Sequence, residues 1–285
     1  MSKRQSSFMF NVSIVISGTI FIQMILYCIS MLAGWTVEFN LVAACHSWMK
    51  KIGLSSLEYV LDALIIYTLL YSIWHIGSQF FHTSRLKKRF EQYKENKFTY
   101  DVNQAHSSGG AEFLVISHPA PLAITMGFVQ PKIVISTGLI KLLTDDELKA
   151  VISHELYHKD NRDPLKIFLL SLCASTMWYI PILKWFNQQY RIIQEVLADE
   201  FAIKKQQTSV NLGSALLKML KVGKLEKMPF AYASFADTSV NYRIEYILNP
   251  LKDVQCKIPL KEAFLSLAIF ILICVFFIYA IALKT

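Results

Sequence analysis

The sequence has little charge, glycine or proline. Only 18% of its 285 residues are charged and 54% are hydrophobic, with ten glycines and eight prolines. A disordered chain would hold fewer apolar residues, and a fibrous or low-complexity chain would hold more glycine and proline. The five cysteines show no C-x-x-C spacing, which argues against a disulfide framework or a cysteine metal site. The mean hydropathy of +0.37 therefore indicates a membrane protein with a soluble part.

The formal net charge is +8, which could suggest a nucleic-acid partner. No basic stretch is interleaved with stacking aromatic residues outside the apolar runs, however, and basic residues gathered on one side of a membrane explain the excess equally well. We therefore expect the lipid bilayer, and no nucleic acid, as a partner.

Three uncharged runs are long enough to cross a bilayer as helices, since about 20 apolar residues suffice. They lie between Arg4 and Glu38, between Asp62 and Arg85, and between Glu262 and Lys284. The first is too long for the apolar core of a signal peptide and is predicted to be a signal anchor. Basic residues at 3–4 and 85–89 place both adjacent helix ends in the cytoplasm and the 35–56 loop outside.

The expected fold class is a membrane α-helical bundle plus a small α+β domain. Residues 1–83 should form two transmembrane helices with a short external loop, and 84–261 a cytoplasmic domain. Residues 262–285 should form a C-terminal transmembrane helix. The protein would thus be a multi-pass protein of the cell membrane.

Within 84–261 the pattern alternates between strand and helix signals. Residues 112–117, 123–126 and 132–136 read as extended segments between proline and glycine turns. Thr144 and Glu147 have capping-box spacing, so a helix is predicted from about 145 to 159. The next helix should start at Asp163, as N-cap, followed by Pro164.

The predicted capped helix contains His154-Glu155-Leu156-Tyr157-His158. Histidines at i and i+4 share one helix face and can bind one ion, while Glu155 beside them can act as general base. With this composition, a chance H-E-x-x-H has a probability of roughly 0.7%. The alternative is an exposed helix with two surface histidines.

A catalytic zinc site needs a third protein ligand. Glu195 and Asp199 are again spaced i, i+4 within an apolar helix, where paired carboxylates are costly without a cation or donors. Glu195 is the candidate ligand, and Asp199 could accept a hydrogen bond from a ligand histidine. Spacing alone does not separate these two residues from Glu200, and an acid pair bound to Arg191 or Lys204 is the structural alternative.

Several blocks together resemble the integral-membrane zinc metallopeptidases of the BlaR/MecR (beta-lactam sensor-transducer) type, and the related HtpX-like and CAAX-prenyl endopeptidases. The resemblance covers about residues 84–260. It implies a gluzincin-like domain with one Zn²⁺ on His154, His158 and Glu195, with Glu155 as general base and Asp199 as supporting acid. The blocks are Thr125-Met126-Gly127, 131–136, Gly138-Leu139, 148–158 and Glu195-x-x-x-Asp199.

The resemblance also suggests two further features of the site, an oxyanion helper and an edge strand that binds substrate. Arg243-Ile244 resembles an Arg-Ile pair found late in these domains, which makes Arg243 a candidate oxyanion helper alongside Tyr157 and Arg191. The resembling peptidases also have an exposed edge strand beside the zinc cleft, where an extended peptide can pair. Here the equivalent strand would contain Ile124, Thr125 and Met126.

The implied function is that of a zinc metalloendopeptidase cleaving a protein or peptide at the cytoplasmic face, in signalling or regulation. The substrate would be a repressor-type protein or the chain itself. The sensor domain of the beta-lactam sensors does not follow the last apolar run, so a separate sensor or regulator protein is an expected partner. The alternatives are a housekeeping quality-control or CAAX-type protease, and a catalytically silent binding or immunity protein.

The 17-residue apolar run between Lys166 and Lys184 is at the lower limit for a membrane span. A single crossing would separate His158 from Glu195 by the bilayer, which one zinc ion forbids. We therefore predict a membrane-associated hairpin near 167–186 that returns to the cytoplasmic face.

Overall fold

The computed structural model describes residues 3–35, 40–54, 56–106, 113–222, 233–234, 240–248 and 259–282. The chain divides into two compact units. Unit 1 comprises residues 1–8, 78–169 and 188–256, and unit 2 comprises 9–77, 170–187 and 257–285. Several long helices begin in one unit and end in the other.

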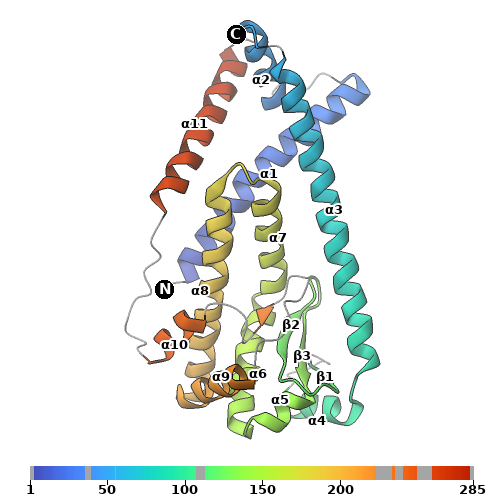
Figure 1. Ribbon diagram of the computed structural model, residues 1–285, viewed down its shortest axis with the longest axis vertical. Helices are drawn as coiled ribbons and strands as arrows, with labels where there is room; N and C mark the ends of the chain where they lie inside the picture. Colours follow the sequence, from blue (N-terminus) through green and yellow to red (C-terminus); the bar gives the residue numbers. More distant parts are fainter. Residues whose placement is uncertain are drawn as a thin grey trace. The chain divides into compact units, whose positions relative to one another are not determined.

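Unit 1 is built around a four-stranded sheet with the order β1-β3-β2-β4 (Figure 1). β1 (Phe113–Ile116) is parallel to β3 (Lys132–Ser136), whereas β2 (Ala123–Met126) is antiparallel to both β3 and β4 (Ala233–Ser234). Gly127, with φ of +104°, begins the turn from β2 to β3, a backbone conformation that favours glycine.

The two faces of this sheet contribute to separate apolar clusters, because successive strand residues point to opposite faces. One cluster joins alternate residues of β1 and β3 to α6 (Asp145–Asp160) and α9 (Val210–Val222). The other joins the remaining strand residues to Phe90 near the end of α3 (Leu57–Gln92). The remaining helices with residues in unit 1 are the start of α1 (Lys3–Ala33), α4 (Asn96–His106), α5 (Thr137–Leu142), α7 (Asp163–Thr176), α8 (Pro181–Gln206) and α10 (Val240–Leu248).

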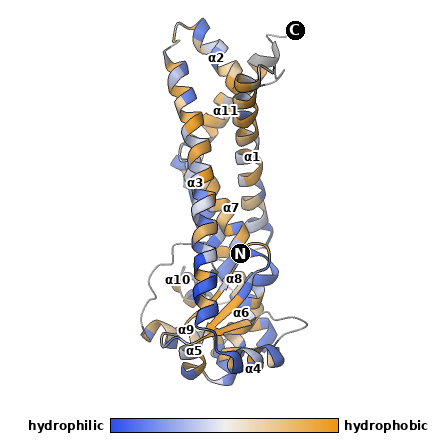
Figure 2. Ribbon diagram, turned by 90° about the vertical axis from the view of Figure 1, so that its right-hand side faces the viewer, coloured by the Kyte–Doolittle hydropathy of each residue, from blue (hydrophilic) through white to orange (hydrophobic). Residues whose placement is uncertain are grey.

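The regular secondary structure of unit 2 is helical in the residues that the structure describes. It contains most of α1 (Lys3–Ala33), α2 (Leu41–Lys51), the first part of α3, the α7–α8 turn and α11 (Leu260–Ala282). α1 and α3 are long and apolar enough to cross a membrane, by length and composition. Figure 2 shows hydrophobic residues along α1, and α3 becoming hydrophilic toward its C-terminal end. The predicted third span coincides with α11 and stays a prediction.

Most of the elements expected in the soluble part are present. The three predicted extended segments are β1, β2 and β3, and the predicted helix from 145 is α6, with its capping box formed by Thr144 and Glu147. α3 ends at Gln92, and α4 begins at Asn96. α2 forms inside the region expected to be an external loop, where Asn40 caps its first turn.

The apolar run near 167–186 is interrupted by a turn, since α7 ends at Thr176 and α8 begins at Pro181. Unit 1 includes residues 78–169, which lead into the run, and residues 188–256, which follow it. The chain therefore leaves unit 1 and returns to it, as the predicted hairpin requires. Its association with a membrane stays a prediction.

Candidate metal centre

Hydrogen bonds fix the first turn of α6 against its neighbours, and the turns that follow then direct particular side chains inward. The Thr144 N–H donates to Glu147 Oε2 at 2.8 Å, and the Glu147 N–H donates to Thr144 Oγ1 at 3.4 Å. Glu147 is also bound from α9 by Ser214 at 2.6 Å and Lys218 at 2.7 Å. The next turns of α6 then bury His154, Glu155 and His158.

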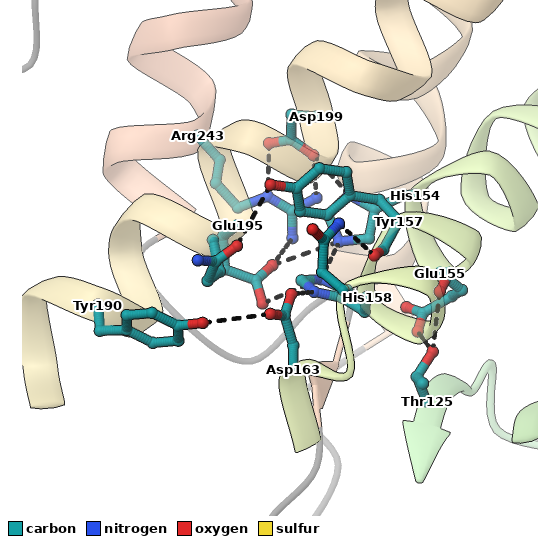
Figure 3. Close-up of polar contacts among 12 residues, drawn as sticks. Thr125, His154, Glu155, Tyr157, His158, Asp163, Tyr190, Glu195, Asp199 and Arg243 are labelled. Atoms are coloured by element: carbon teal, nitrogen blue, oxygen red, sulfur yellow. Dashed lines mark hydrogen bonds and ion pairs between the residues drawn. The ribbon is translucent and has the colours of Figure 1, made fainter. Parts of the chain in front are cut away.

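Two helices contribute three ligand atoms to one buried point (Figure 3). The Nε2 atoms of His154 and His158 are 3.1 Å apart. Glu195, on α8, places Oε2 at 3.4 Å from His154 Nε2 and Oε1 at 3.6 Å from His158 Nε2. The structure thus brings together the three residues that the sequence suggested as ligands.

This donor set fits zinc. Bonds of about 2.0–2.1 Å in a tetrahedral site put neighbouring ligand atoms about 3.3 Å apart, close to the three separations observed. Two imidazole nitrogens and a carboxylate oxygen are ordinary zinc ligands, and three of them leave one position for water. Without a cation, the two buried imidazole nitrogens would face each other.

A carboxylate lies against the Nδ1 atom of each histidine. Asp199 Oδ1 is 2.8 Å from His154 Nδ1, and Asp163 Oδ2 is 2.8 Å from His158 Nδ1. A carboxylate accepts a hydrogen bond from an Nδ1–H group, and a hydrogen on Nδ1 leaves Nε2 available to a metal, so each carboxylate favours the tautomer that a zinc ligand needs. The Asp199 contact agrees with the sequence prediction, whereas Asp163 was expected only as a helix cap.

Arg243, on α10, is fully buried against the acidic side of this site. Its Nε and Nη2 atoms donate to the two oxygens of Asp199 at 2.8 and 2.6 Å, and Nη1 lies 3.2 Å from Glu195 Oε2. The oxyanion role suggested for Arg243 from the sequence stays a prediction. The guanidinium is engaged in holding Asp199 and Glu195, because both acids would be costly to bury without a cation.

The charges of the site shift the pKa values of its acids. Burial raises the pKa of Asp199, but the Arg243 charge and the His154 contact outweigh this and bring it to about 2. Burial likewise raises the pKa of Glu195, yet His154, His158 and Arg243 leave it below its ordinary value. Both groups are therefore carboxylates near neutral pH, as a metal site requires.

Glu155, which follows His154 on α6, is contacted from β2. Its Oε2 accepts a hydrogen bond from Thr125 Oγ1 at 2.7 Å, while Oε1 is buried and has no hydrogen-bond partner among the described residues. Burial is the main cause of a raised pKa for Glu155, against the charges of His158 and His154 and the Thr125 bond. A raised pKa favours the proton uptake that a general base must perform.

A chain of polar contacts extends from the site helices to the first turns of α1. The Tyr157 hydroxyl donates to Gln194 Oε1 at 3.3 Å, and Gln194 Nε2 donates to Ser6 Oγ at 3.0 Å. Tyr157 and Gln194 each adjoin a candidate metal ligand in the sequence. Tyr157 is thus engaged with Gln194.

The structure also bears on two other expectations, that Glu200 could be a ligand and that β2 is an exposed edge strand. Glu200 pairs with Lys204 on the outer side of α8, which separates it from the two acids of the site. β2 is also not a free edge, because β4 pairs with it through Ile124 and Thr125. All four residues of β2 are buried, so the expected exposed edge strand is covered in this structure.

Comparison with known proteins finds one regulatory protein that is similar to this chain and one peptidase family whose model matches it. Over 144 residues, the chain is 26% identical to the regulatory protein BlaR1 of Bacillus licheniformis. This segment is 49% of the chain and spans 23% of that relative's length. Residues 16–247 match the family model of the BlaR1 peptidase M56. The resemblance to HtpX-like and CAAX-prenyl endopeptidases stays a prediction. Since the match extends over most of the chain, and over both the apolar helices and the candidate metal centre, this protein belongs to the BlaR1 peptidase M56 family.

Proposed function

We propose that this protein is a membrane-embedded zinc endopeptidase that cleaves a protein substrate at the cytoplasmic face, in signalling or regulation. The observation that carries the proposal is the buried His154, His158 and Glu195 cluster with Glu155 on the same helix. Family membership supports peptide-bond hydrolysis. The similarity to a regulatory protein favours a regulatory substrate, either a repressor-type protein or the chain itself.

His154, His158 and Glu195 would hold one zinc ion. When bound, the ion lowers the pKa of a water ligand and polarises the scissile carbonyl. Glu155 would take the proton of the attacking water and pass it to the leaving amine. Thr125 orients the carboxylate of Glu155 through the hydrogen bond to Oε2.

Substrate binding would use the edge of β2 that β4 covers. β4 shows that an extended segment can pair antiparallel with Ile124 and Thr125. Main-chain pairing of this kind is a common mode of peptide recognition and depends little on side-chain identity. A substrate would therefore have to replace β4, and Ile124, Thr125 and Met126 would lie beneath it.

The topology proposed from the sequence gives this site its orientation. Residues 1–83 would form two membrane helices, 84–261 the cytoplasmic peptidase domain, and 262–285 a third membrane helix. The positive charges after the second helix support a cytoplasmic peptidase. A separate sensor or regulator protein would supply the external signal.

The first experiment tests the zinc site on full-length protein purified in detergent. His154→Ala should lose both zinc and peptide hydrolysis, because it removes a ligand. Glu155→Gln should keep zinc and lose turnover, because it removes only the base. Full zinc content and normal activity in Glu195→Ala would show that Glu195 is not the third ligand.

The second experiment tests the regulatory role. New protein N-termini would be compared between cells carrying the wild type and cells carrying Glu155→Gln. One or a few cleavages in regulatory proteins, or in this chain, would support the proposal. Broad cleavage of misfolded or prenylated membrane proteins would favour a housekeeping protease, and identical profiles with an inactive purified protein would favour a silent scaffold.

A further inference from the structure

We propose that Asp163 is a positioning residue of the metal site, which holds His158 in the orientation and tautomer needed to bind zinc. The proposal rests on the function proposed above, because it concerns how one ligand of that site is prepared. Neither the sequence pattern nor the family match assigns this role to Asp163.

Both carboxylate oxygens of Asp163 have a separate contact. Oδ2 lies 2.8 Å from His158 Nδ1, and Oδ1 accepts a hydrogen bond from the Tyr190 hydroxyl at 3.4 Å. Asp163 and His158 have no exposed surface, and Tyr190 is 1% exposed. Figure 3 shows Asp163 between the His158 ring and Tyr190. Contacts on both oxygens limit rotation of the carboxylate, and the carboxylate in turn fixes the plane of the imidazole.

The chain reaches this position through a tight reversal after α6. The helix ends at Asp160, and the side chain of Asn161 donates to the Tyr157 carbonyl at 2.8 Å. Arg162 then adopts a left-handed conformation with φ of 53°, which few residues other than glycine take. On a continuing helix, Asp163 would lie about 140° around the axis from His158. The reversal instead brings Asp163 back to the imidazole, so its carboxylate contacts the ring of His158 rather than capping α7.

Asp199 and Asp163, the carboxylates that contact the two histidines, differ in whether a cation lies beside them. Asp199 is neutralised by the guanidinium of Arg243. Among the residues that the structure describes, the partners of Asp163 are His158 and Tyr190, and neither is a permanent cation. The contact of Asp163 with His158 is therefore not shared with a permanent cation, and a carboxylate on Nδ1 makes an imidazole a stronger metal ligand.

The test compares Asp163→Asn with the matched control Asp160→Asn, which changes an exposed carboxylate three residues earlier. Zinc affinity would be measured on full-length, detergent-purified protein by competition with a chelating dye. Asp163→Asn should bind zinc about 10–100-fold more weakly, the usual loss when the partner of a ligand histidine is changed. Asp160→Asn should match the wild type. Substitution by cobalt gives a second measurement, because visible absorption bands respond to ligand orientation and should change only in Asp163→Asn.

Wild-type affinity and an unchanged cobalt spectrum in Asp163→Asn would overturn the proposal. If this variant fails to fold, Tyr190→Phe decides. It removes the hydroxyl that orients Asp163 and keeps the ring, so it should weaken zinc binding by a smaller factor, and unaltered affinity would count against the proposal. A wild type that does not bind stoichiometric zinc would instead refute the proposed function.

Discussion

Thr125 and Glu155 are joined across two elements by a short hydrogen bond. The hydroxyl of Thr125, on β2, donates to Glu155 Oε2 at 2.7 Å and also lies 3.1 Å from the Glu155 carbonyl oxygen. The strand that we propose to bind substrate is thereby connected to the general base. Because both side chains are fully buried, the position of the base depends on this contact.

The first prediction concerns that hydroxyl. Thr125→Val keeps the shape of the side chain but removes the donor, so peptide hydrolysis should fall by on the order of tenfold or more, since misplaced catalytic groups lose much of their effect. Thr125→Ser should retain most of the activity, and both variants should keep full zinc content. A fully active Thr125→Val protein would show that the hydroxyl does not position Glu155.

Thr125→Val is a better test than proline at the same position. β2 pairs on one side with β3 and on the other with β4, so proline would disturb the sheet as well as substrate binding. Loss of activity in Thr125→Pro could then come from altered folding.

The second prediction concerns Arg243. Arg243→Met leaves Asp199 and Glu195 buried without their guanidinium, which should destabilise the protein by about 3–5 kcal/mol, the usual cost of breaking a buried ion pair. The double variant Arg243→Met with Asp199→Asn should recover part of this loss, as measured by thermal unfolding of the zinc-free protein. Normal stability with reduced kcat in Arg243→Met would instead support the oxyanion role.

The third prediction concerns acid stability. Burial raises the pKa of Glu147, but the bonds from Lys218, Ser214 and Thr144 outweigh this and lower it from 4.5 to about 2. A folded-state pKa below the unfolded value stabilises the protein above about pH 4.5, and this contribution is lost as the pH falls toward 2.

The matched variant for this prediction is Glu147→Gln, which cannot ionise. It should unfold at a lower temperature than the wild type at pH 7, and the difference should shrink as the pH approaches 2. Comparing the two proteins at each pH cancels the titration of the metal site. A difference that stays constant from pH 7 to pH 2 would contradict the ionised Glu147 network.

The fourth prediction concerns the hairpin. If residues 167–186 return to the cytoplasmic face, an exposed cysteine near the end of α8 should not react with a membrane-impermeant reagent in intact cells. Lys205→Cys, in a background without the native cysteines, provides this probe, since Lys205 is exposed. Ser47→Cys on α2, in the predicted external loop, is the positive control. Labelling of Lys205→Cys from outside would show that the run crosses the membrane.

Local sequence determined the central part of the site. The Thr144 and Glu147 capping box starts α6, and the i, i+4 spacing then places His154 and His158 on one face. Each of these features depends on residues within one helix, so short-range rules suffice to predict them. The extended segments of the sheet were likewise apparent from β-branched residues between turns.

The tertiary structure decided everything that depends on distant segments. Spacing left Glu195, Asp199 and Glu200 as alternatives, and only the packing of α8 against α6 brought Glu195 to the histidines and left Glu200 with Lys204. The contacts of Arg243 and the pairing of β4 with β2 depend in the same way on residues far apart in the chain. Asp163 differs, because it is near His158 in sequence, but the left-handed turn at Arg162 determines that its carboxylate faces the imidazole. A periodic sequence pattern does not predict such a reversal of the chain. The left-handed backbone at Arg162 costs free energy, and contacts formed only in the folded protein offset this cost.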